Sequence, residues 1–121
     1  MKRDIDLVRQ ILIAAESEPT GYASGNPEIE GYSEEQVGFQ VHLMEQAGLV
    51  EAADASTLDS VSPSAILISI KWKGHDFLDA AKSNSVWAQA KEKAKTVGGS
   101  LTFDLMKELL VATARSQLGL Q

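Results

Sequence analysis

A chain of 121 residues, 44 % of them hydrophobic, is long enough to form one domain with its own core. It contains no cysteine, which excludes disulfides, thiolate metal sites and cysteine nucleophiles and suits a reducing compartment. No apolar run resembles a signal peptide or approaches the roughly 20 residues that span a bilayer, so we expect a cytoplasmic protein without membrane contact.

The net charge of −6 is distributed unevenly along the chain. Residues 10–70 contain ten acidic residues and no lysine or arginine, whereas residues 71–121 contain eight basic and five acidic residues. Such an asymmetry is informative about partners rather than about the fold. We expect the acidic part to repel phosphate groups.

The first predicted element is a helix from Asp4 to about Ser17, because apolar residues recur there at helical spacing. Pro19 and Gly21 end this helix. The loop that follows to residue 33 is rich in Gly and Pro, and it holds at most a short strand around Ile29.

A second helix is predicted from Ser33 to Ala47. Ser33 and Gln36 form a capping-box pattern, and Gly48 stops the helix. The helical period places an apolar line on one side and a polar face on the other. The line consists of Val37, Val41 and Met44, with Phe39 and Leu43 beside it, and the outer face consists of Glu35, Gly38, His42 and Glu45.

Residues 49–56 and 65–70 are predicted to form an antiparallel hairpin across a polar loop, with Ile66, Ile68 and Ile70 on one face. Helices are then predicted over 71–82, from the end of the break "SNS" (83–85) to a stop at Gly98-Gly99, and over 102–118. The last helix has a wide apolar arc, which predicts a homodimer contact.

The stretch "KWKGHDFLDAAK" (71–82) reads as an amphipathic helix. Its predicted inner side consists of Gly74, Phe77, Leu78 and Ala81, and its predicted outer side of His75, Asp79 and Lys82.

The segments "MEQAGLV" (44–50) and "IKWKGHDFL" (70–78) flank the predicted hairpin. In this order the elements resemble a winged helix, in which a helix with a Leu-x-x-Ala-Gly-Leu turn precedes a two-stranded wing. The expected fold is mainly α with a small β-hairpin (α+β). We expect a single winged-helix-like domain over 1–121, with a core over 1–82 and a C-terminal helical extension over 83–121.

A closer resemblance covers nearly the whole chain. The segments "MKRDIDLVRQIL", "GYSEEQVGFQVHLMEQAGLVEA" and "WKGHDFLDAAK", followed by Trp87, are similar to the uncharacterised bacterial and phage-associated family catalogued as domain of unknown function 2513. That family commonly has Thr before the tryptophan, where this chain has Lys71, which cannot cap a helix as Thr does. The resemblance implies a small winged-helix-like protein and brings no activity with it.

Two interpretations of the "WKGHDFL" stretch compete. In the first, His42, His75-Asp76 and Asp104 follow the residue order of metal-dependent HD phosphohydrolases, in which a divalent metal activates water. In the second, which we favour, the stretch is a packing corner. Trp72 and Phe77 then close the core, Gly74 permits a close backbone approach, and His75 pairs with Asp79 on the surface.

No nucleophile paired with a base and no glycine-rich phosphate loop is recognisable. We therefore expect a protein that is not an enzyme and has no cofactor or metal.

Two kinds of partner remain open. A helix that reads a DNA groove needs basic or amide side chains, and the phosphates need cations nearby, whereas the second helix and the wing are acidic. We therefore favour a protein partner contacted by Glu35, His42, Glu45, His75 and Asp79. DNA binding by a transcriptional regulator is the alternative, through phosphate contacts from Lys71, Lys73, Lys91 and Lys95, joined by Lys82 and Lys93. These lysines also fit an ordinary solvated face, and His42 also fits a solvated histidine.

Overall fold

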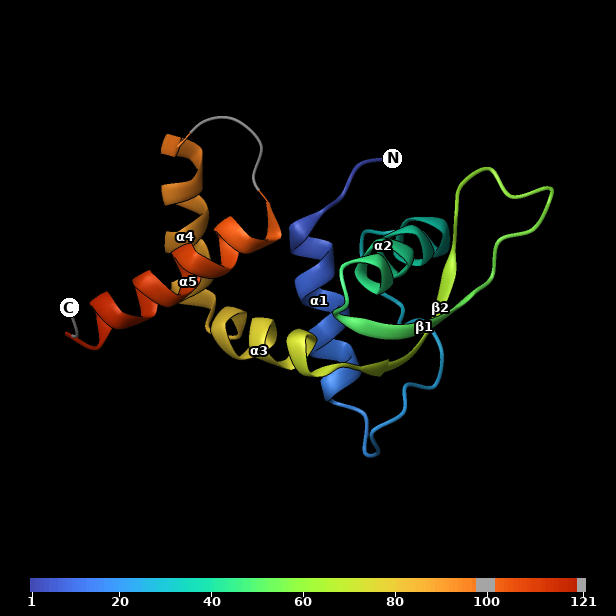
Figure 1. Cartoon of the computed structure of the whole chain (residues 1–121), viewed down its shortest axis with the longest axis horizontal. Helices are drawn as coiled ribbons and strands as arrows, with labels where there is room; N and C mark the ends of the chain where they lie inside the picture. The colour runs from blue at the N-terminus through green and yellow to red at the C-terminus, as the bar shows by residue number, and fades with distance from the viewer. Residues whose placement is uncertain (98–101, 120–121) are drawn as a thin grey trace. The chain divides into compact units, whose positions relative to one another are not determined.

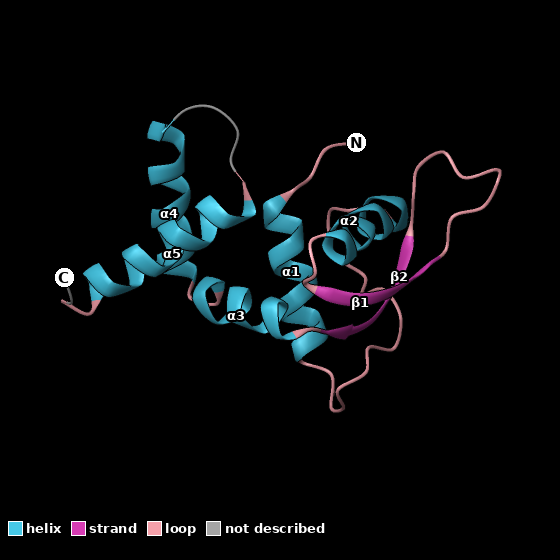
Figure 2. Cartoon of the chain, viewed as in Figure 1, coloured by secondary structure: helices cyan, strands magenta, loops and turns pink. Residues whose placement is uncertain are grey.

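The computed structural model describes residues 1–97 and 102–119, which form five helices and one two-stranded antiparallel sheet (Figure 1; Figure 2). The predicted class, mainly α with one β-hairpin, is confirmed. The predicted stop at Gly98-Gly99 lies outside the described residues. In chain order the elements are α1 (Ile5–Glu16), α2 (Glu34–Gln46), β1 (Val50–Asp54), β2 (Ala65–Ile70), α3 (Trp72–Ala81), α4 (Asn84–Val97) and α5 (Phe103–Gln117).

The chain divides into two compact units, Met1–Asp76 and Phe77–Gln121, with the boundary inside α3. We call them the first and the second unit. The predicted single domain, with a division after residue 82, stays a prediction.

Local capping fixes the start of α1 and both ends of α2, where the sequence predicts the capping box and the stop at Gly48. The Asp4 carboxylate accepts a hydrogen bond from the Leu7 amide at 3.1 Å. In α2 the Ser33 hydroxyl accepts from the Gln36 amide at 3.1 Å, and the Gln36 side chain accepts from the Ser33 amide at 2.8 Å. Gly48 then takes a φ of +77°, which glycine adopts without a steric penalty.

The core of the first unit lies between α1, α2 and one face of the hairpin. The three isoleucines of β2 do not share one face as predicted, because the register skips Ile68 and pairs Ile70 with the buried Val50. At the start of β2, Ala65 and Leu67 are buried, while Ile66 is 48 % exposed. Strand alternation explains this result, because residues 65 and 67 share the side opposite to residue 66. The buried residues of the two helices are Leu7, Val8, Ile11, Leu12, Val37, Val41 and Met44.

Gly38 is also buried, and its prediction as an outer-face residue is wrong. A Cβ atom at this position would overlap the Ser64 hydroxyl and lie 3.8 Å from the Asn26 side-chain nitrogen. Glycine therefore lets α2 approach the residues that precede β2.

The loop between α1 and α2 follows β2 along the edge that β1 leaves open. The Asn26 side chain donates to the Ala65 carbonyl and accepts from the Leu67 amide, both at 2.8 Å. The Ala23 amide donates to the carbonyl of Ile68, a residue that the register with β1 skips. The loop forms no strand around Ile29. The open edge of β2 is instead covered by the hydrogen bonds of the Asn26 side chain and the Ala23 amide.

The second unit is organised around Phe77. Its ring lies 4.6 Å from the ring of Phe103 and 6.2 Å from that of Trp87, centroid to centroid, and the latter contact is edge-on. Between α4 and α5, the Lys93 ammonium donates to the buried Thr113 hydroxyl at 3.0 Å. The unit therefore combines an aromatic cluster with a polar link between its two long helices.

Helix α3 confirms the predicted inner side and corrects the placement of one residue. Gly74, Phe77, Leu78 and Ala81 are all buried. Trp72 does not close the core, because it is 82 % exposed. At about 100° per residue, Trp72 lies nearly opposite both Gly74 and Ala81 on the helix, so α3 cannot bury all three.

We predict that Gly74→Ala destabilises the protein. The new Cβ would overlap the Leu49 carbonyl oxygen and lie 2.8 Å from Ile70 Cγ2. Overpacking of this kind costs about 1–3 kcal/mol, which should exceed the gain of about 1 kcal/mol in helix propensity. Urea unfolding followed by circular dichroism measures the loss. The matched control is Gly21→Ala, where a Cβ meets nothing within 4 Å and φ is not positive; equal stability of the two variants would contradict the assignment.

Candidate partner-binding surface

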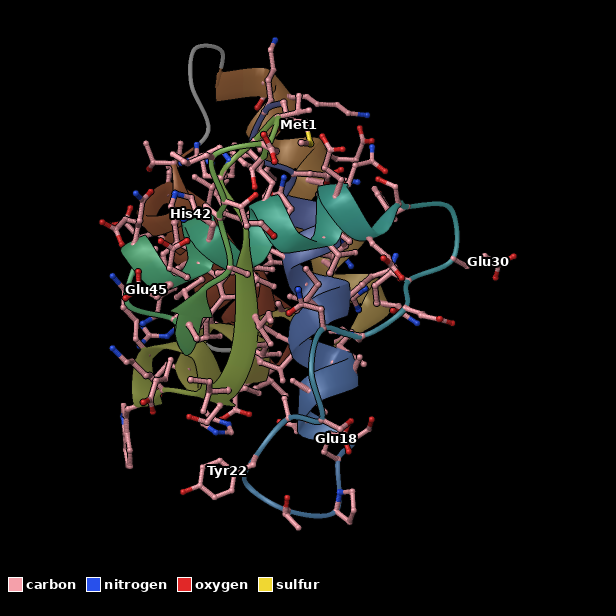
Figure 3. All side chains as sticks on the ribbon, turned by 90° about the vertical axis from the view of Figure 1, so that its right-hand side faces the viewer. Met1, Glu18, Tyr22, Glu30, His42 and Glu45 are labelled. Carbon is pink, nitrogen blue, oxygen red and sulfur yellow. The ribbon has the colours of Figure 1, made fainter. Side chains whose placement is uncertain are left out.

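The exposed face of α2 is acidic. Glu34, Glu35 and Glu45 are exposed, and His42 on the same helix is half-buried. Glu35 and His42 are seven residues apart and Glu34 and Glu45 eleven, close to two and three helical turns, so each pair lies on one face. Figure 3 shows His42 and Glu45 on the part of α2 nearer its C-terminal end. Three of the five predicted partner contacts, Glu35, His42 and Glu45, therefore lie along one side of α2, within about 80° of one another around the helix.

The end of β1 adds to this negative surface. Asp54 is exposed and lies close enough to His42 for the two side chains to interact electrostatically, and the sequence offers no compensating lysine or arginine between residues 10 and 70. Glu51 is also exposed, but it follows the buried Val50 and therefore points to the opposite side of the hairpin. We call Glu34, Glu35, Glu45 and Asp54 the acidic surface. A field of one sign over neighbouring elements attracts cationic partners and repels phosphate.

His42 lies beside the acidic surface on α2, and its half-buried ring packs at the edge of the core. Its ring stacks on Phe39, with 6.4 Å between the ring centroids and 27° between the planes. Its proximity also contributes to holding the pKa of Asp54 down. The histidine thus connects α2 electrostatically to the end of β1.

Asp54 ends β1 in a tight turn. Its carboxylate accepts a hydrogen bond from the Ser56 amide at 2.9 Å. The Ser56 amide and hydroxyl, followed by His42, lower the pKa of Asp54 below its ordinary value, because all three favour the charged form. The acidic surface therefore keeps this charge over a wider pH range than an ordinary aspartate would.

The two remaining predicted partner contacts lie on α3. His75 and Asp79 are exposed, as predicted, but no side-chain hydrogen bond joins them in the described part of the chain. His75 borders a cavity of about 90 Å³ beside the end of α1, the following loop and β2. That volume is far below the roughly 300 Å³ typical of a ligand pocket. No interaction among the described residues joins His75 to Glu35, His42 or Glu45 on α2. Asp79 belongs to the second unit.

The predicted phosphate contacts are divided between the units. Lys71 and Lys73 are exposed on either side of Trp72 in the first unit. Lys91 and Lys95 lie on α4, where Lys95 forms an exposed ion pair with Glu92 at 3.0 Å. Lys82 and Lys93 are both exposed, and the Lys93 ammonium also donates a hydrogen bond to Thr113, which links α4 to α5.

The described residues contain neither a candidate metal site nor a candidate membrane-spanning helix. Among the described residues, no group of three or more His, Asp or Glu side chains is arranged to hold a metal ion. His42, His75 and Asp76 belong to the first unit and Asp104 to the second. No helix in the described ranges is long and apolar enough to cross a membrane.

Sequence reasoning missed three features of the first unit: the Asn26 bridge, the exposure of Trp72, and the two apolar side chains Leu58 and Val61 in the loop between β1 and β2. The segment "ASTLDSVSPS" contains the signal for Leu58 and Val61, because these two aliphatic residues stand in a segment that otherwise has turn composition. For Trp72 the helical period itself was the signal.

The chain is thus a small α+β protein with a β-hairpin and an acidic face. It belongs to the family described as "Hypothetical protein (DUF2513)", whose model matches residues 2–100. The match spans the first unit and α4 and ends before α5. An uncharacterized protein of Haemophilus influenzae is 36 % identical over 110 residues, covering 90 % of this chain and 92 % of its own length. No solved structure matches the chain significantly.

We predict that the Asp54 carboxyl titrates below its ordinary pKa of 3.8. Carbon-detected NMR titration of the side chain measures this directly. Since the folded pKa is lowered, the stabilisation is fully present above 3.8 and is lost as the pH falls through the folded value. Ser56→Ala should raise the pKa partway by removing the hydroxyl, and His42→Ala should raise it by less. An ordinary pKa for Asp54, unchanged in both variants, would disprove the turn geometry.

Proposed function

We propose that this protein is a cytoplasmic, non-enzymatic winged-helix interaction module that binds a protein partner with a basic surface. The observation that carries the proposal is the acidic surface on α2 and β1. In a winged helix the exposed side of the second helix would enter the DNA groove, and here that side presents glutamates. Cations on a protein partner would complement these charges, whereas DNA phosphates would be repelled.

The winged-helix assignment is part of the proposal and is supported by the order of α1, α2, β1, β2 and α3. The loop held by Asn26 stands where a helix-turn-helix would have its positioning helix. A loop at that place is a second reason to favour a role other than groove reading.

DNA binding by a transcriptional regulator is the alternative function. The exposed Lys71, Trp72 and Lys73 favour it, because lysines contact phosphates and an exposed aromatic ring stacks on bases. These three residues belong to the same unit as the acidic surface, which opposes the approach of phosphates. The third alternative, an HD-type metal phosphohydrolase, rests on residue order alone.

Site-specific photo-crosslinking in living cells tests the protein-partner proposal. A photoreactive phenylalanine analogue replaces Glu35 or Glu45 in the full chain, and the control position is Gln10, which is exposed on α1. We expect discrete protein adducts from positions 35 and 45, well above those from position 10.

Charge variants make the test specific. The double variant Glu35→Lys/Glu45→Lys, probed from position 34, should lose the adducts. The matched control Glu28→Lys/Glu30→Lys makes the same change in net charge at two exposed loop residues and should retain them. Equal labelling from position 10, or adducts that contain nucleic acid instead of protein, would overturn the proposal.

We also propose a homodimer formed through α5. Met106, Leu110 and Thr113 of this helix are buried, while Val111 and Leu118 at the other side and the end remain exposed. Sedimentation equilibrium should show a monomer–dimer equilibrium that Val111→Asp shifts to monomer by about tenfold in dissociation constant, a typical hot-spot effect. The control is Ile13→Asp on α1, which has similar exposure. A monomer at high concentration for the unmodified protein would refute the dimer.

A further inference from the structure

The loop between β1 and β2 has a closed neck. The Ala55 amide donates to the Ser64 carbonyl at 2.9 Å, and the Ser64 amide donates to the Ser56 hydroxyl at 2.9 Å. The Asp54 carboxylate binds the Ser56 amide on the same side. Hydrogen bonds thus fix both ends of the loop, which extends away from the strands in Figure 1.

The tip of the loop is also braced. The Thr57 amide donates to the Ser60 hydroxyl at 2.8 Å, and the Ser60 amide donates to the Thr57 carbonyl at 3.1 Å. Their two hydroxyls lie 3.1 Å apart. Residues 57–60 therefore form a turn with a defined shape, and a partner that binds it pays little ordering entropy.

This braced turn and the residue that follows it display apolar side chains. Leu58 has a relative exposure of 106 % and Val61 of 89 %, the two highest values among the large hydrophobic residues of the described chain. Neither side chain contributes to the core, and a fully buried aliphatic side chain would contribute about 1.5–3 kcal/mol. Asp59 lies between them in the sequence, and the loop contains no base.

We propose that Leu58 and Val61 are anchors that insert into an apolar pocket of a protein partner, whose rim presents a lysine or arginine to Asp59. This inference rests on the proposed function, since it assigns the partner of the acidic surface a shape and a charge. Charge complementarity selects the occupant: Asp59, Asp54 and the acidic surface favour a basic rim. The same carboxylates disfavour nucleic acid and the anionic face of a membrane.

The test uses the full chain in cells with the photoreactive residue at position 58 or at position 61. We expect adducts with the same protein that positions 35 and 45 label. Mass spectrometry of the adducts should place the crosslinked partner residues in an apolar pocket with a lysine or arginine at its rim. The control position is Tyr22, which is 72 % exposed in the loop between α1 and α2.

Variants then test the chemistry, with the adduct from position 35 as the readout. Leu58→Asp/Val61→Asp should reduce its yield at least about tenfold, as expected for hot-spot residues. Leu58→Met, which remains apolar, and Tyr22→Asp should preserve the yield. Thermal unfolding should be unchanged in all these variants, because the substituted side chains are exposed.

The outcomes separate this inference from the proposed function. If position 35 labels a partner but the Asp variants leave that adduct unchanged, the anchor inference is wrong and the proposed function stands. If positions 58 and 61 give adducts but positions 35 and 45 give none above control, the proposed function fails, and the anchor inference, which concerns the partner of the acidic surface, is overturned with it. If none of the four positions labels a protein, both are overturned.

Discussion

The two hydrogen bonds between the Asn26 side chain and β2 are the contact on which the first unit depends. They fasten the loop after α1 to the open edge of a sheet that has only two strands, and such a sheet is marginal by itself. The same asparagine lies where α2 approaches Ser64, and the glycine at position 38 leaves room for the Ser64 hydroxyl at this contact. Loop, sheet and helix therefore meet at one point, and the face of α2 that remains outside carries the glutamates.

The charge distribution and the shape of the first unit both favour binding to a protein. The acidic surface and the carboxylates of the hairpin loop belong to a stretch of sixty-one residues without a lysine or arginine. The exposed Leu58 and Val61 lie in and next to a turn that internal hydrogen bonds already hold in shape in the unbound protein. A preorganised apolar contact surrounded by charges of one sign is typical of protein recognition, where a few anchors supply the affinity and charges supply the specificity.

Local signals in the sequence predicted most of the elements. The capping box at Ser33 and the glycine at position 48 set the ends of α2, and helical spacing identified the buried side of α3. The Asn26 bridge could not be predicted, because its partners lie 39 and 41 residues further along the chain. The size of Trp72 favours burial, but the helical period places it opposite Gly74 and Ala81, and its side chain is exposed. For the candidate site, the acidic face of α2 followed from the sequence, whereas the exposure of Leu58 and Val61 required the geometry of the loop.

The most direct test of the central claim, recognition of protein rather than DNA, is fluorescence anisotropy with labelled duplex DNA at low and at physiological salt. Low salt strengthens every phosphate contact, including non-specific ones. The account predicts no binding at either salt concentration, because the acidic surface outweighs Lys71 and Lys73. Micromolar or tighter binding that weakens steeply with salt would contradict it and would make the lysines the working surface.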